Sequence, residues 1–224
     1  MVLDKKFIII MSIICGIYIV LSPVVFLIVN DSLHIMLGWN LLLALIPFLI
    51  AIIIDSKRNS KAWVLALLFL VWLLFFPNTF YMITDFIYID YTKFMNSTGY
   101  LTLEYLQDPI AYLALIHIFL GAFLGVTLGY LCLHVVVESL LKPRFGNKFW
   151  LLLSAICFMS SIGIFIGRFF RYNSWDLIRV FAIIKDFITD FTWFNVLFIL
   201  LFMLTQLFLY WLIKSLGTQI KKNS

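Results

Sequence analysis

The sequence predicts an all-α protein, a polytopic transmembrane helical bundle with about six spanning helices. Of its 224 residues, 64% are hydrophobic and only 12% are charged, whereas about a quarter of the residues of a soluble domain carry charge. The apolar residues come in runs of about 18 or more, which suffice to cross a hydrocarbon core roughly 30 Å thick. We therefore expect residues 1–224 to form a single integral membrane domain.

The first three predicted helices cover residues 7–29, 33–54 and 62–77. The first follows lysines as a signal peptide does, but it lacks a small-residue cleavage site and should be retained. Asn40 in the second helix is expected to hydrogen-bond to a neighbouring helix, and His34 at its start is expected to be an interfacial residue. The third helix meets Pro77 before it can cross the membrane, so a kinked or re-entrant continuation must follow.

The remaining predicted helices cover residues 110–141, 149–167 and 193–213, and residues 93–109 are expected to form an ordinary loop. A short interfacial helix is expected between the last two spans. Gly121, Gly125 and Gly129 are each four residues apart, which places them on one helical face and allows another helix to approach closely. His117 shares that face; we expect it to make a buried hydrogen bond, with metal ligation as the alternative.

The basic residues predict the orientation of the chain. Both ends of the chain and the loops at residues 55–61 and 142–148 are rich in Lys and Arg, and six helices would place all four on one side. The positive-inside rule makes that side cytoplasmic, with both termini there. The net charge of +5 is therefore a topology signal and does not point to nucleic acid. Arg168, Arg171, Arg179 and Lys185 are exceptions, because they fall on the outer side.

Two stretches rich in polar residues would meet on that outer side: residues 75–90 (FFPNTFYMITDFIYID) and residues 167–176 (GRFFRYNSWD). An α-helix would align polar side chains of the first stretch in one stripe. Asp85 is the expected partner of Arg168 or Arg171, because an ionised group at membrane depth needs a counter-charge. The candidate polar site comprises Asn78, Tyr81, Asp85, Tyr88, Arg168, Arg171, Asn173, Trp175 and Asp176. The alternative is that the ion pair only locks two broken helices together.

At these residues the chain resembles a known family. The pattern F-x-P-N-x-x-Y-x-x-T-D-x-I at residues 75–87 and the pattern G-R-F-x-R-x-N-S-W-D at residues 167–176 resemble the bacterial membrane family called domain of unknown function 1361. The resemblance implies a multi-pass protein of the bacterial cell membrane and supplies no activity. Tyr88 stands where that family often has His, which weakens any proposal of metal or His-based acid–base chemistry.

Three classes of function remain open. The favoured one is binding or transport of an anionic small molecule or lipid head group at the outer polar site, because guanidinium groups suit phosphate and carboxylate. The second is a membrane enzyme acting on a lipid-linked substrate, with Asp85 as general base. The third is an accessory protein that docks another membrane protein. No cofactor or metal is expected, because no metal-ligand spacing or nucleophile–base pair is present; the expected partners also include membrane lipids.

Overall fold

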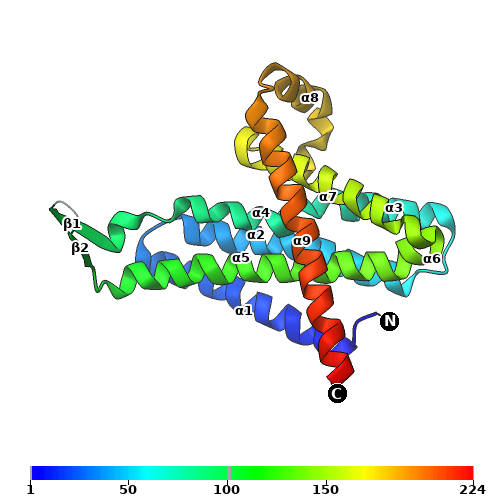
Figure 1. Ribbon diagram of the computed structural model, residues 1–224, viewed down its shortest axis with the longest axis horizontal. Helices are drawn as coiled ribbons and strands as arrows, with labels where there is room; N and C mark the ends of the chain where they lie inside the picture. The colour runs from blue at the N-terminus through cyan, green and yellow to red at the C-terminus, as the bar shows by residue number, and fades with distance from the viewer. Residues whose placement is uncertain (1, 100–101, 224) are drawn as a thin grey trace.

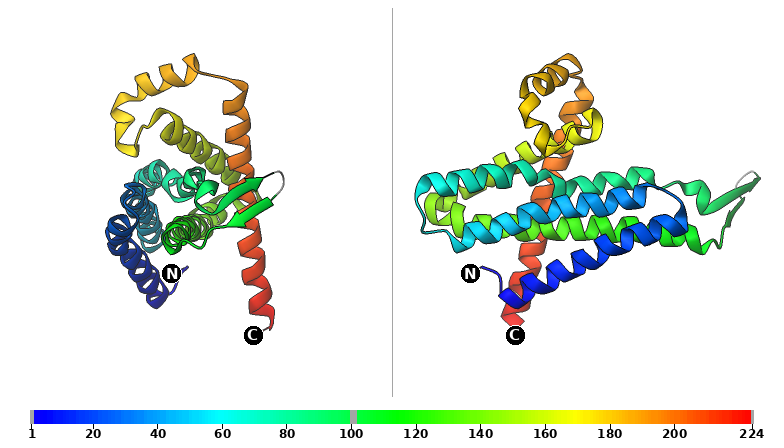
Figure 2. Two further views of the ribbon diagram at one scale, coloured as in Figure 1. Left: turned by 90° about the vertical axis from the view of Figure 1, so that its left-hand side faces the viewer. Right: turned by 180° about the vertical axis from the view of Figure 1, so that it is seen from behind.

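The computed structural model describes residues 2–99 and 102–223, and nearly all of them lie in helices (Figure 1). Long helices running along one axis form a bundle: α1 (Lys5–Val29), α2 (Leu33–Ser56), α3 (Ala62–Phe75), α5 (Pro109–Val136) and α7 (Phe149–Phe165). A further long helix, α9 (Trp193–Asn223), crosses this bundle (Figure 2).

Shorter elements connect the long helices. Before α5 they are α4 (Pro77–Tyr81), the 3₁₀ helices η1 (Met82–Tyr88) and η2 (Tyr91–Lys93), and the strands β1 (Met95–Gly99) and β2 (Thr102–Tyr105). After α5 come the π-helix η3 (Val137–Leu141), α6 (Lys142–Phe145) and the 3₁₀ helix η4 (Gly146–Lys148). After α7 come the π-helix η5 (Ile166–Phe170), the 3₁₀ helix η6 (Ser174–Arg179) and α8 (Val180–Thr189).

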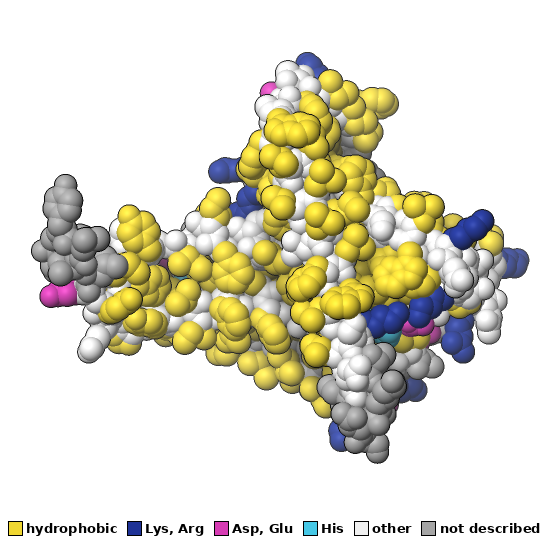
Figure 3. Space-filling view, in the orientation of Figure 1, with side chains coloured by type: hydrophobic (Ala, Val, Ile, Leu, Met, Phe, Trp, Pro, Cys, Tyr) yellow, Lys and Arg dark blue, Asp and Glu magenta, His cyan; other side chains and the backbone are white. Residues whose placement is uncertain are grey.

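The surface of the bundle is that of a membrane protein. Hydrophobic side chains cover its flanks, while most Lys and Arg side chains gather at the end where α6 lies (Figure 3). Large apolar side chains such as Val20 and Leu27 are 71% and 76% exposed, which is stable only where lipid replaces water around them. Several helices are long and apolar enough to span a membrane. The predicted multi-pass helical architecture is confirmed.

The third crossing is broken at Pro77, as the sequence predicted. Helix α3 ends at Phe75, α4 begins at Pro77, and η1 continues to Tyr88. Proline lacks a backbone donor, so placing it at the first position of a new helix avoids losing a hydrogen bond. The combined segment Ala62–Tyr88 has the length and apolar composition of a span. The break brings polar residues of the first motif into the interior of the bundle.

Segments α4 and η1 pack directly on the glycine face of α5. A Cβ atom built on Gly125 would lie 2.6 Å from the carbonyl oxygen of Thr79, and one built on Gly129 would lie 2.6 Å from Cε2 of Phe80. A Cβ on Gly121 would overlap the hydroxyl group of Tyr18. Because no side chain fits at these positions, the backbones of the two segments approach more closely than other residues would allow.

The segment at residues 93–109 differs from the ordinary loop that we expected. Strands β1 and β2 pair antiparallel, with Asn96 opposite Glu104. Cross-strand backbone hydrogen bonds satisfy the polar groups of the segment. The polar run that ends at Gly99 has no alternation of apolar and polar residues and therefore lacks the period-two pattern that indicates a strand.

Helix α9 also differs from expectation, because it does not lie antiparallel to α7 as a sixth member of the bundle (Figure 1). It crosses α7, where Gln206 donates a hydrogen bond of 2.9 Å to Ser161 and the rings of Phe198 and Phe165 lie 5.6 Å apart. Helix α8 precedes it on one side of the bundle, and α9 runs from there to the other side (Figure 2). Its composition is that of a span, but its direction differs from that of the other spans.

The predicted orientation can be tested by cysteine labelling in intact cells. Cysteine at Asn96, in β1, is expected to react with a membrane-impermeant thiol reagent, while cysteine at Asn59, in the basic turn before α3, should react only after permeabilisation. The native thiols Cys15, Cys132 and Cys157 are buried, so background labelling should be low. The reverse labelling pattern would invert the topology.

Candidate functional site

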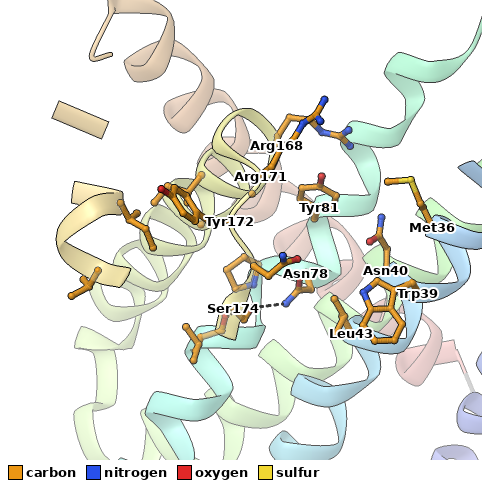
Figure 4. Close-up of a pocket in the computed structure, with 18 of the residues that line it drawn as sticks. Met36, Trp39, Asn40, Leu43, Asn78, Tyr81, Arg168, Arg171, Tyr172 and Ser174 are labelled. Carbon is orange, nitrogen blue, oxygen red and sulfur yellow. Dashed lines mark hydrogen bonds between the residues drawn. The ribbon is translucent and has the colours of Figure 1, made fainter. Parts of the chain in front are cut away.

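A cavity of about 920 Å³ lies between α2, α4 and the segment from η5 to α8 (Figure 4). Its polar wall is formed by Asn40, Asn78, Tyr81, Tyr88, Arg168, Arg171, Tyr172, Asn173 and Ser174. Its apolar wall includes Trp39, Leu43, Leu74, Ile183 and Ile184. The two motif stretches, which are far apart in the sequence, therefore face each other across one space.

Asp85 and Arg168 form an ion pair behind the polar wall. Arg168 donates from Nη2 to Oδ1 of Asp85, and the two side chains are only 11% and 3% exposed. Asn40 donates from Nδ2 to the other carboxylate oxygen, Oδ2, at 3.3 Å, so it makes the contact across helices that the sequence predicted. Both oxygens of the carboxylate thus have donors, as a buried charge requires.

Arg168 is held on every side. Its Nε donates to the hydroxyl of Thr84 at 2.8 Å, and its Nη1 donates to the hydroxyl of Tyr88 at 3.0 Å. Its guanidinium carbon lies 4.6 Å from the ring centroid of Tyr81 and 5.3 Å from that of Tyr88. Stacking on aromatic faces stabilises a partly desolvated cation. These contacts fix the position of the Arg168 side chain.

Thr84 is a contact that the sequence analysis missed. The predicted site left Thr84 out, although residues three apart, such as Tyr81 and Thr84, lie on the same side even of an α-helix. Residues 82–88 form a 3₁₀ helix, in which residues three apart are fully aligned. Tyr81 and Thr84 therefore share a face, and the Thr84 hydroxyl donates to the carbonyl of Tyr81 at 2.6 Å. The position of Thr84 next to Asp85 in the first motif is the sequence feature that could have indicated this contact.

The second motif is tied to the first by a pair of polar side chains. Asn78 donates from Nδ2 to the hydroxyl of Ser174 at 3.1 Å, and that hydroxyl donates to the carbonyl of Leu74, also at 3.1 Å (Figure 4). Ser174, like Thr84, was absent from the predicted site. On the other side of the cavity Tyr172 donates to Asp186 at 2.8 Å, and this hydrogen bond raises the pKa of the Tyr172 hydroxyl.

Six of the predicted site residues line the cavity: Asn78, Tyr81, Tyr88, Arg168, Arg171 and Asn173. The other three do not. Asp85 lies behind Arg168. Trp175 packs edge-on against Trp39, with ring centroids 6.4 Å apart. Asp176 accepts a 2.8 Å hydrogen bond from the backbone N–H of Asn173 and so shapes the turn. Arg168 and Trp175 lie on different elements, because the helix that carries Arg168 ends at Arg171.

Arg171 differs from Arg168 in having no fixed partner. Its backbone is left-handed, with φ of 59°, where it terminates η5. Its side chain lines the cavity and forms no ion pair or hydrogen bond with any residue that the structure describes. A left-handed conformation is uncommon for residues other than glycine and is often found at functional positions. The wall thus holds one neutralised guanidinium group and one without a counter-charge.

The polar groups on this wall are cationic or neutral. No carboxylate lines the cavity among the described residues, and neither does any His or Cys. A guanidinium group offers paired N–H donors that match phosphate or carboxylate oxygens. The amides of Asn40 and Asn78 and the hydroxyl of Tyr81 add neutral hydrogen-bonding groups.

Comparison with known proteins agrees with the two motifs. Residues 39–209 match the model of a family described as a protein of unknown function (DUF1361). The chain belongs to this family. The matched region begins at Trp39, on the cavity wall, and contains both motif stretches and every polar residue of the wall. No curated protein and no solved structure matches the chain.

Proposed function

We propose that this membrane protein binds an anionic, amphipathic ligand in the cavity between the two motif stretches. The observation that carries the proposal is the uncompensated charge of Arg171 on a cavity wall without carboxylates. Arg171 is exposed in the structure, so its guanidinium group is accessible to an anion that enters the cavity. The acidic group of the ligand would contact Arg171, with the second amide hydrogen of Asn40 and the hydroxyl of Tyr81 nearby.

The apolar wall supports an amphipathic ligand over a small hydrophilic anion. Trp39, Leu43 and Leu74 lie on one side, and Ile183 and Ile184 of α8 lie on the other. Apolar lining with a few placed polar groups is the usual composition of a site that buries most of a ligand. A phospholipid or another lipid with an acidic head group has both parts and is supplied by the membrane itself.

The geometry argues against the enzymatic alternative. A general base needs a free lone pair within hydrogen-bond reach of its substrate. Both carboxylate oxygens of Asp85 already accept hydrogen bonds, from Arg168 and Asn40, and the side chain lies behind the cavity wall. We therefore assign Asp85 to holding Arg168 in place.

The proposal predicts a ligand-induced stabilisation that depends on Arg171. Short-chain phosphatidylglycerol should raise the melting temperature of the detergent-solubilised protein, and phosphatidylcholine of equal chain length should raise it far less. A ligand at 100 times its Kd stabilises by about 2.7 kcal/mol, which is a shift of several degrees. Arg171→Gln should lose most of this shift while keeping the melting temperature of the free protein.

Lys185→Gln is the matched control, because Lys185 is an exposed cation of α8 that does not line the cavity. It should respond to phosphatidylglycerol as the wild type does. Equal shifts for the two lipids, or a full shift in Arg171→Gln, would refute an anion site at Arg171.

A further inference from the structure

A second polar cluster lies buried among α1, α2 and α5, apart from the cavity wall. His34 and His117 are 1% and 5% exposed, and Tyr18 and Ser22 of α1 are buried beside them. The expectation that His34 is interfacial was therefore wrong. Its partner, His117, lies on another helix, 83 residues away in the sequence, so no local pattern could indicate the contact.

The hydrogen bonds of the two α1 side chains fix which nitrogen of His117 carries a proton. Ser22 donates its only hydroxyl hydrogen to the carbonyl of Tyr18 at 2.8 Å. The same oxygen lies 3.2 Å from Nε2 of His117, so it must accept a hydrogen bond from an Nε2–H group. Tyr18 donates to the backbone carbonyl of His117 at 2.9 Å and has no second hydrogen to offer. A neutral His117 therefore presents a bare lone pair at Nδ1.

That lone pair faces His34. The two Nδ1 atoms are 3.1 Å apart, and the rings meet edge to face. Because Nδ1 of His117 is unprotonated, Nδ1 of His34 must carry the hydrogen between them. A second hydrogen on Nδ1 of His117 would bring two N–H groups together at this distance. The pair can therefore gain one proton, at Nε2 of His34, but not two.

We propose that His34 and His117 form a buried proton-binding site, distinct from the anion cavity. In the neutral state the pair shares one hydrogen between its Nδ1 atoms, and on acidification it takes up a single further proton. This proton creates a charge at the junction of α1, α2 and α5. The site thereby couples the proton concentration outside the bundle to the packing of these helices.

The electrostatic surroundings suit a single charge. Asp31, just before α2, and Lys93, in η2, act on His34 with opposite signs, and Asp85 in η1 acts on Tyr18. Asp85 is already neutralised by Arg168. Among the described residues no third His, Cys, Asp or Glu joins the pair in a metal-binding group, which favours a proton over a metal ion as the species bound.

Nitrogen NMR of histidine-labelled protein tests the proposal directly, because the chain has only three histidines. At neutral pH we expect one Nδ1–H tautomer, His34, and one Nε2–H tautomer, His117, assigned with the His34→Asn and His117→Asn variants. On acidification the pair should gain one charge in total down to pH 5. Two independent titrations near pH 6.5, identical tautomers, or a metal bound by both rings would each overturn the proposal.

The pH dependence of stability gives a second readout. The unfolded chain protonates both histidines below about pH 6.5, whereas the folded pair accepts at most one proton. The unfolded state then binds more protons, so stability is complete above that pH and falls as the pH is lowered. The wild type should therefore lose more of its melting temperature between pH 7.5 and pH 5 than the double Asn variant. His134→Asn is the control and should behave as the wild type; equal losses in wild type and double variant would contradict the assignment.

Discussion

Replacing Asp85 by Asn is expected to lower the free energy of unfolding by about 3–5 kcal/mol, the usual cost of removing one partner of a buried ion pair. The guanidinium group of Arg168 would stay in place at 11% exposure, with hydroxyl groups and aromatic rings as its remaining contacts. None of these carries a full negative charge. Thermal or denaturant unfolding in detergent measures the loss.

Adding Arg168→Gln to Asp85→Asn should restore part of the stability, because both charges are then gone. Removing both partners of a buried pair can be nearly neutral. The double variant should therefore be more stable than the sum of the single effects predicts, and the double-mutant cycle gives the coupling energy. No coupling, together with unchanged stability of Asp85→Asn, would show that the pair contributes nothing to the fold.

Asp90→Asn is the matched control, since Asp90 is close to Asp85 in sequence but takes no part in a buried ion pair. Asp90 is exposed, and hydrogen bonds from Thr92 hold its pKa below the ordinary value. Asn and Asp are about equally good at such a capping position. The substitution should change stability by less than about 1 kcal/mol.

The double variant also separates the two roles that the pair could have. If Asp85 and Arg168 only lock two broken helices, the folded double variant should keep the stabilisation by phosphatidylglycerol. If they also position Arg171 and the cavity wall for a ligand, the double variant should fold but lose that response. Stability and ligand response are measured in the same melting experiment, so a negative result for one does not obscure the other.

The spans and the break at Pro77 could be predicted because each depends on a local property, the length of an apolar run or a missing backbone donor. The pairing of Asp85 with an arginine 83 residues away was predicted from the cost of an unpaired ion at membrane depth. The contact of Arg168 with Thr84 was not predicted, because the two residues are 84 positions apart in the sequence. The change from α-helical to 3₁₀ geometry after Tyr81 aligns Tyr81 with Thr84 without altering the composition of the segment.

Three other features were not predicted either. Arg171 adopts a left-handed backbone where η5 ends, although neither Gly nor Asn marks the position. His34 is buried by a partner on α5. The direction of α9 is set by contacts such as that of Gln206 with Ser161, whereas its apolar composition would suit any direction through lipid.

Gly125→Leu is expected to be the most damaging substitution on the glycine face of α5. The Cβ position of residue 125 lies 2.6 Å from the carbonyl oxygen of Thr79 and 3.0 Å from Sδ of Met82. A backbone oxygen cannot rotate away as a side chain can, so α4 and η1 would have to move. Overpacking by one methyl group already costs about 1–3 kcal/mol, and leucine adds three more carbon atoms. A clear loss of melting temperature should follow.

Three alanine variants, Gly16→Ala, Gly125→Ala and Gly129→Ala, show whether backbone contact is the cause. Gly16→Ala in α1 meets nothing within 4 Å and should be neutral or stabilise by up to about 1 kcal/mol, since alanine is the better helix former. Gly129→Ala meets Cε2 of Phe80 at 2.6 Å and Oγ1 of Thr79 at 2.8 Å, both of which belong to side chains that can shift. We therefore expect Gly129→Ala to lie between Gly16→Ala and Gly125→Ala in stability. If Gly125→Leu melts at the wild-type temperature, α4 and η1 do not pack against α5 in the folded protein, and the close approach that carries Asp85 into the bundle is disproved.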